Sequence, residues 1–215
     1  MKRRSLAYFG VALALLVAGN CALLPVILRS IPTPTPTPKV RDFWLSDLFV
    51  ELSALSPQCW VYKGPIPLSY EENKGAEEAL FAWFECYHPP DPPGGGMYAI
   101  YRFRDSQSAA RRYRRDFLGW FPRANLITPY ATPDWMEYQS PVADQFRFAC
   151  ADFYGGYPEV HGKVCTSIGQ YEEYISAFTF GISPPEKIAD YTEFLEQMLR
   201  AVDNRMAHYL GKDVR

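Results

Sequence analysis

Four cysteines beyond residue 50 carry the most recognisable chemistry in this chain, at positions 59, 86, 150 and 165. They include no C-x-x-C pair and spread over more than a hundred residues, so neither a redox motif nor a zinc site is indicated. An even number of dispersed cysteines is typical of disulfide bonds in an oxidising compartment. We therefore expect two disulfides in this part of the chain.

The pairing of these cysteines follows from a predicted hairpin. The stretch Gln145–Gly169 has strand-like runs on both sides of a central turn, which would place Cys150 opposite Cys165. Along the strands, Cys150 shares its side with phenylalanines, whereas Cys165 shares its side with polar residues. Facing residues should lie on the same side of the sheet, so direct pairing would require a bulge or an off-centre loop. By elimination Cys59 pairs with Cys86, and the other two connectivities stay open.

Catalytic motifs are absent from the linear sequence, which has no H-E-x-x-H, G-x-S-x-G, Walker or G-x-G-x-x-G pattern. Its three histidines are His88, His161 and His208, and Gly94–Gly96 lacks the Lys-Ser/Thr of a phosphate loop, which favours a flexible turn. Because Ser-His-Asp triads are defined by geometry, an envelope hydrolase or thiol-active enzyme stays an alternative. We predict no cofactor and no metal.

Arginines crowd one short segment, with six of them in fourteen residues at positions 102, 104, 111, 112, 114 and 115. Guanidinium groups bind phosphates and carboxylates, so Arg111 and Arg115 are candidates for holding an anion or a lipid headgroup. The competing interpretation is a solvated helix face, because the arginines lie mostly off the apolar stripe of the predicted helix.

The segment Trp120–Ala143 is the stretch that we favour for ligand binding. It holds 24 residues with four prolines and no clear periodicity, which is longer than structural connections usually are. Tyr130, Trp135 and Tyr138 are the candidate ligand-binding residues, because exposed aromatic rings in a loop either bind something or pack. Packing of these rings over a sheet is the alternative.

Composition indicates one packed domain that does not bind nucleic acid. The 215 residues are 48% hydrophobic and 16% aromatic, far from the composition of disordered chains. Residues 1–39 contain five basic residues and no acid, and subtracting these five from 22 leaves 17 basic residues against 24 acidic ones in residues 40–215. A net charge of about −7 opposes phosphate binding.

The N-terminal region predicts a membrane tether. Residues 5–28 carry no charge, and a helix of that length spans about 36 Å at 1.5 Å per residue, enough for the hydrocarbon core of a bilayer. The basic tail 1–4 marks the cytoplasmic side, so residues 42–215 should lie outside the cytoplasm in the cell membrane. The Thr/Pro-rich segment 29–41 favours a polyproline II spacer between the two.

Two other interpretations of the N-terminus also place the domain outside the cytoplasm. One is a cleaved secretory signal with an apolar region near residues 6–18. The other is a lipoprotein in which Cys21 carries the lipid, although Asn20 is a poor residue before such a cysteine. The apolar run continues past both sites, which favours the uncleaved anchor.

Hydrophobic periodicity predicts the α+β class. We expect helices over residues 42–55 and 106–118, and a long amphipathic helix that starts near residue 183 or 190 and stops at Gly211. Strand-like runs occupy residues 59–62, 79–87, 97–103, 145–153, 163–168 and 171–180. A helix over residues 76–86 is the alternative to the second run, because Ala, Glu and Leu favour helices. The order suggests a repeated ββα pattern, with an antiparallel sheet covered by helices on one side.

The resulting functional hypothesis is a membrane-anchored, non-catalytic module that binds a small ligand or another envelope protein. Its first partner is the lipid bilayer, through residues 5–28. The envelope enzyme is one alternative, and a structural subunit of an envelope assembly is another. A concave surface lined by aromatic rings would favour the binding module.

Overall fold

A computed structural model describes residues 40–51, 59–69, 72–87, 94–115, 125–155 and 160–213. These residues form a six-stranded sheet in which every pair of neighbouring strands is antiparallel. The strands are β1 (Cys59–Pro67), β2 (Glu78–Cys86), β3 (Gly94–Arg102), β4 (Gln145–Gly155), β5 (Val160–Tyr171) and β6 (Tyr174–Ile182). Their order across the sheet is β1-β2-β3-β6-β5-β4, and the α+β class is confirmed.

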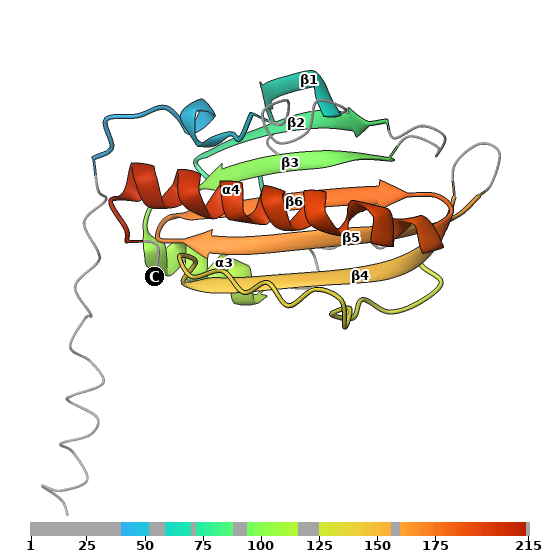
Figure 1. Cartoon of the computed structure of the whole chain (residues 1–215). Coiled ribbons are helices and arrows are strands. Elements are labelled where there is room, and N and C mark those ends of the chain that lie inside the picture. Colours follow the sequence, from blue (N-terminus) through green and yellow to red (C-terminus); the bar gives the residue numbers. More distant parts are fainter. Residues whose placement is uncertain are drawn as a thin grey trace, which may run out of the picture. The chain divides into compact units, whose positions relative to one another are not determined.

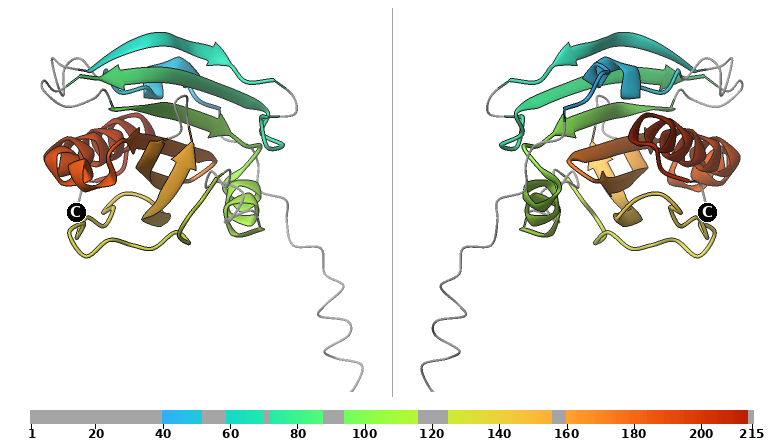
Figure 2. Two further views of the ribbon diagram at one scale, coloured as in Figure 1. Left: turned by 90° about the vertical axis from the view of Figure 1, so that its right-hand side faces the viewer. Right: turned by 90° about the vertical axis from the view of Figure 1, so that its left-hand side faces the viewer.

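Two helices pack on opposite faces of this sheet. Helix α3 (Ser106–Arg115) lies on one face, and α4 (Thr192–Leu210) crosses the other (Figures 1 and 2). The expected cover by helices on one side is therefore wrong. The periodicity of a helix shows which stripe is apolar but does not show on which face of a sheet that stripe packs.

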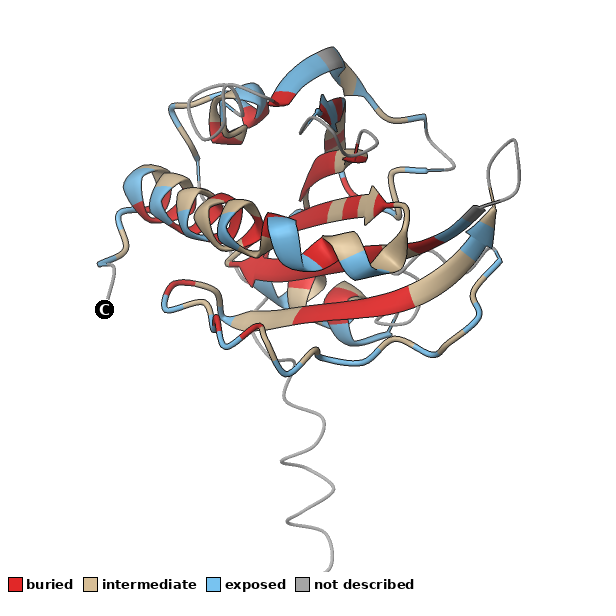
Figure 3. Cartoon of the chain, turned by 45° about the vertical axis from the view of Figure 1, so that its right-hand side comes forward, coloured by how far each residue is buried: buried red, intermediate tan, exposed pale blue. Residues whose placement is uncertain are grey.

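Burial of both faces follows from alternation along the strands. In β6, Tyr174 and Phe178 point to the α4 side, and Ile175 and Ala177 point to the α3 side. The inward side of α4 is buried and its outward side is exposed (Figure 3). Both sides of the central strands are thus removed from water, which makes them nearly continuous apolar runs.

Each face has its own hydrophobic cluster. The α4-side core includes Phe84, Tyr98, Tyr138, Phe148, Tyr171, Tyr174, Phe178, Phe180, Tyr191, Leu195, Met198 and Met206. The α3-side core consists of Ala76, Ala79, Ala99, Tyr101, Phe103, Ala109, Tyr113, Ala149, Ile168, Ile175 and Ala177. Alanines make the α3-side core shallow, so it buries less side-chain volume than the α4-side core.

The order of elements repeats as βββα, so all six expected strands are present but the expected ββα description of the repeat was one strand short. Three strands and a helix, β1-β2-β3-α3, are followed by a second set in the same order, β4-β5-β6-α4. Strands β3 and β6 pair along the middle of the sheet. Because α3 and α4 lie on opposite faces, the repeat concerns the order of elements and not the packing of the helices.

The helix predicted over residues 42–55 is wrong. In the described residues 40–51 the only helical piece is the 3-10 turn η1 (Leu45–Leu48), and the chain is extended again at Phe49. Leu45 and Leu48 are buried, and Phe43 packs beside them in the α4-side core. An irregular segment can therefore bury the same apolar residues that suggested helical periodicity.

The long C-terminal helix is confirmed. A 3-10 segment, η3 (Pro185–Tyr191), leads into α4. Gly211 ends α4 in the left-handed conformation at φ 65°, which glycine adopts without strain. The predicted cap of α3 is present as well, because the carboxylate of Asp105 accepts a hydrogen bond from the backbone N–H of Ser108 at 2.6 Å.

Both predicted disulfides are confirmed. Cys59 bonds Cys86 between β1 and β2, and Cys150 bonds Cys165 between β4 and β5. The register of β4 and β5 is unbroken and pairs Cys150 directly with Cys165, without a bulge. The polar side of β5 is buried here, since Ser167 is 5% exposed, so alternation of polar and apolar residues was a poor guide to register.

The outer edge of β4 is covered by residues 125–132. Ala131 exchanges two backbone hydrogen bonds with Cys150, both at 2.9 Å, and the backbone N–H of Tyr154 donates to the carbonyl of Asn125 at 2.8 Å. Coverage of an edge strand removes unpaired backbone groups that would otherwise recruit another chain.

No helix in the described part of the chain is long and apolar enough to span a membrane. The predicted tail 1–4, anchor 5–28 and nearly all of the linker 29–41 lie outside the described residues. Their assignment therefore stays a prediction.

Candidate functional site

An apolar cavity opens on the α3 side of the sheet. Its volume is about 320 Å³, which is at the small end of the range for ligand sites. Met97 joins it to the α3-side core, against which that side chain also packs. The described lining consists of Trp83, Gly95, Gly96, Met97, Leu126, Phe153, Val164, Thr179 and Gly181.

Glycines make the floor of the cavity, because they leave the backbone of the sheet uncovered. Among the described residues, a Cβ on Gly181 would meet no atom nearer than two backbone oxygens at 3.8 and 3.9 Å, those of Gly95 and Lys163. No described side chain therefore fills the space directly above Gly181. At Gly162 a Cβ would meet the ring of Phe153 at 2.6 Å, so that glycine lets the ring lie against the sheet.

Aromatic rings form the walls. Trp83 on β2 is 38% exposed, which is high for a tryptophan in a strand, and its ring stands edge-on to that of Phe81 at a centroid distance of 6.1 Å. On the other side stands the ring of Phe153 from β4. Aromatic walls on a glycine floor are suited to flat apolar molecules.

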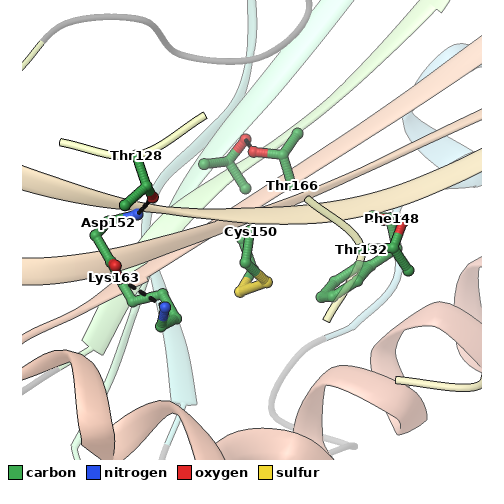
Figure 4. Close-up of a disulfide and its surroundings, with 9 residues drawn as sticks. Thr128, Thr132, Phe148, Cys150, Asp152, Lys163 and Thr166 are labelled. Carbon is green, nitrogen blue, oxygen red and sulfur yellow. Dashed lines mark hydrogen bonds and ion pairs between the residues drawn. A yellow bond between two sulfur atoms is a disulfide. The ribbon is translucent and has the colours of Figure 1, made fainter. Parts of the chain in front are cut away.

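Hydroxyl groups border one end of the cavity. The hydroxyls of Thr166 and Thr179 are 3.1 Å apart, and these residues are register partners on β5 and β6. Thr166 lies on the opposite side of the sheet from the Cys150 disulfide (Figure 4). Tyr130 packs against the α3-side core nearby. Burial raises the pKa of Tyr130, and the Thr166 hydroxyl opposes that rise. We call Tyr130, Thr166 and Thr179 the hydroxyl row.

A second polar cluster lies on the α4 side, around the buried carboxylate of Asp203. Asp203 is 2% exposed and accepts hydrogen bonds from Tyr138 at 2.5 Å, Tyr171 at 2.7 Å and Ser140 at 2.8 Å. Burial and the Asp203 charge raise the pKa of Tyr138 and Tyr171, so both remain neutral donors. This cluster fastens the segment before β4 to α4 and leaves no open site around the carboxylate.

The structure divides the three predicted aromatic residues between the two faces. Tyr130 packs with the α3-side core and belongs to the hydroxyl row beside the cavity. Trp135 packs with its ring edge-on to Phe148 at 6.1 Å, and Tyr138 is buried at Asp203. Of the three, Tyr130 alone lies near the cavity, and the other two pack on the α4 side.

Arg111 and Arg115 lie exposed on α3. Arg111 donates a hydrogen bond to the Ser108 hydroxyl at 3.0 Å, and neither arginine belongs to the described lining of the cavity. The structure therefore places them on the same side of the sheet as Tyr130 and does not join them to Trp135 or Tyr138.

His161 and His208 are exposed, and His88 lies outside the described residues. The backbone carbonyl of His161 accepts a hydrogen bond from the Ser183 hydroxyl at 2.7 Å, and the His208 ring stands beside Tyr209. Within the described residues, no group of three or more histidine, cysteine or acidic side chains is arranged to hold a metal ion.

The cavity was not predicted from the sequence, because glycines of its floor were interpreted as turn residues. Gly94–Gly96 was expected to form a flexible turn, but these residues begin β3. Glycine inside a strand is a known signal of close approach by a ligand or by another backbone. Gly162 and Gly181 carry the same signal in β5 and β6.

No protein-family model, curated protein or solved structure matches this chain.

Proposed function

We propose that this chain is a membrane-tethered binding module outside the cytoplasm, and that its folded domain takes an apolar ligand in the cavity over Gly181. The space above that glycine carries the proposal, since a Cβ there would meet described atoms only at 3.8 and 3.9 Å, which are ordinary van der Waals distances. A folded sheet gains stability from covering such a surface. Aromatic walls around a floor that no described side chain covers are therefore better explained by a ligand than by packing.

The size of the cavity suggests the size of the ligand. An engineered apolar cavity of about 150 Å³ holds benzene, so a volume of about 320 Å³ suits a molecule of about two fused rings or an equivalent branched chain. The side walls supply Trp83, Met97 and Phe153 for contact with such a molecule.

Placement outside the cytoplasm is supported by the disulfides and by the N-terminal sequence. Two disulfides in a domain of this size are typical of oxidising compartments. The uncharged residues 5–28 after a basic tail are typical of an anchor. Arg41, the first charged residue of the described domain, pairs with Glu172 and Glu173 at the turn between β5 and β6, at 2.7 Å to each carboxylate.

Arg41 therefore lies at the end of the sheet opposite the cavity. Strand β6 starts beside that turn at Tyr174 and reaches the cavity floor at Gly181, a distance of about 24 Å at 3.4 Å per residue.

Filling the cavity tests the proposal. We expect the full-length protein in lipid nanodiscs to bind 2-methylnaphthalene in equilibrium dialysis, after subtraction of the uptake by empty nanodiscs. Gly181→Leu should raise the Kd more than about tenfold, because the new side chain occupies the space of the ligand and a tenfold change needs only about 1.4 kcal/mol.

Gly181→Ala is the matched control. Its single methyl group would stand in ordinary van der Waals contact with its neighbours, so binding should stay within about twofold to threefold of that of the unaltered protein. The proposal is wrong if the unaltered protein takes up no more 2-methylnaphthalene than the Gly181→Leu variant does.

A further inference from the structure

The polar groups of the cavity are concentrated at one end. Apart from the indole N–H of Trp83, Thr179 supplies the one polar side-chain group of the described lining. Among the described side chains, the Thr179 hydroxyl forms a hydrogen bond with the Thr166 hydroxyl. A hydroxyl group can donate once and accept twice, so the Thr179 hydroxyl keeps capacity for a second partner.

The burial of the two threonines shows that the Thr179 hydroxyl offers its remaining hydrogen-bonding capacity to the cavity. Thr166 is fully buried, at 0% exposure, whereas Thr179 is partly exposed and lines the cavity. Tyr130 stands at the buried end of the row, next to Thr166. Because the hydrogen bond between the Thr166 and Thr179 hydroxyls polarises both groups, a ligand atom at the open end meets a better donor or acceptor than an isolated threonine would supply.

From this arrangement we infer that the cavity selects apolar molecules that carry one hydrogen-bonding oxygen, such as a phenol or a cyclic ketone, with that oxygen bound by Thr179. The ring system lies over Gly181 between Trp83 and Phe153, and the oxygen completes the hydroxyl row. This inference rests on the proposed function, because it assigns a ligand class to the same cavity.

A pair of probes of nearly equal shape tests the oxygen requirement. The reference is the partition of the two probes from water into hexadecane, a hydrocarbon that offers no hydrogen bond. The unaltered full-length protein in nanodiscs should prefer 2-naphthol over 2-methylnaphthalene more strongly than hexadecane does. In Thr179→Val the Kd for 2-naphthol should rise about fivefold, the usual scale for one neutral hydrogen bond, while that for 2-methylnaphthalene changes less than about twofold.

Thr179→Ser is the conservative control, because it keeps the hydroxyl and loses only a methyl group. It should retain the preference for 2-naphthol. Thr179→Val removes the hydroxyl that bonds Thr166, and this variant could fold poorly for that reason. The comparison with hexadecane uses the unaltered protein alone, so it tests the inference without this variant.

The possible failures are distinct. If both probes bind, but with the preference that hexadecane shows or with equal losses in Thr179→Val, the oxygen requirement is wrong and the apolar cavity stands. If neither probe binds the unaltered protein above the background of empty nanodiscs, the proposed function and this inference both fail.

Discussion

At the scale of single residues, Asp203 is the clearest case of a polar group that organises apolar surroundings. A buried carboxylate is costly unless its oxygens are hydrogen-bonded, and three hydroxyl groups satisfy those of Asp203. Two of the donors, Tyr138 and Ser140, belong to the segment before β4, and the third, Tyr171, ends β5. One side chain of α4 therefore fixes two other parts of the fold.

Replacing Asp203 should destabilise the protein strongly. Asp203→Ala leaves the buried hydroxyls of Tyr138 and Tyr171 without their acceptor, and we expect the free energy of unfolding to fall by about 3 kcal/mol. Urea denaturation of the variant measures this. Asn204→Ala is the control, since Asn204 is the exposed neighbour on α4, and a change within about 0.5 kcal/mol is expected there. Equal effects of the two substitutions would show that the cluster does not stabilise the fold.

Some of these residue-level contacts could be predicted from the types of the residues and their spacing. The cysteine pairs could be predicted because a hairpin and an even count leave few choices. Tyr138 was recognised as an aromatic residue that must bind or pack, but its partner Asp203 lies 65 positions away. A contact that exists only after two distant segments fold together leaves no local pattern in the sequence.

At the scale of elements, strands and the C-terminal helix were predicted well, and the first helix was not. Central strands such as β6 and the long helix α4 have apolar patterns that only one structure explains. The described part of the segment, residues 42–51, buries a few apolar side chains from a mostly irregular conformation. The cavity was also out of reach, because it needs glycines and rings from β2, β3, β4, β5 and β6 to meet on one face.

The two hairpins closed by disulfides predict how the protein responds to reduction. In protein isolated from its native cells, the four domain cysteines should resist alkylation under denaturing conditions until a reductant is added. Replacing Cys150 and Cys165 together by alanine should lower the free energy of unfolding by about 3 kcal/mol, since their loop holds 15 residues. The longer loop of 27 residues between Cys59 and Cys86 predicts a slightly larger loss. Freely alkylated thiols in the isolated protein would contradict both the bridges and the oxidising compartment.

At the scale of the whole domain, the sheet separates two different surfaces. The α4-side core is deep and aromatic, and its buried polar cluster is closed by hydrogen bonds. The α3 side is shallow and rich in alanine and glycine, and it keeps an open cavity beside the part that α3 packs against. Stability therefore depends mainly on one face, which leaves the other face free to bind.

Four of the five methionines of the chain, those that follow Met1, report on these two faces separately. Met97 lines the cavity, whereas Met136, Met198 and Met206 belong to the α4-side core. Methyl NMR of the full-length protein, labelled at its methionine methyl groups and titrated with 2-methylnaphthalene, therefore tests directly whether the cavity is the ligand site. The Met97 resonance should shift in a saturable way while the other three stay in place, and Gly181→Leu should abolish the shift. A Met97 resonance that does not move, or shifts confined to the α4-side methionines, would contradict the assignment of function to this cavity.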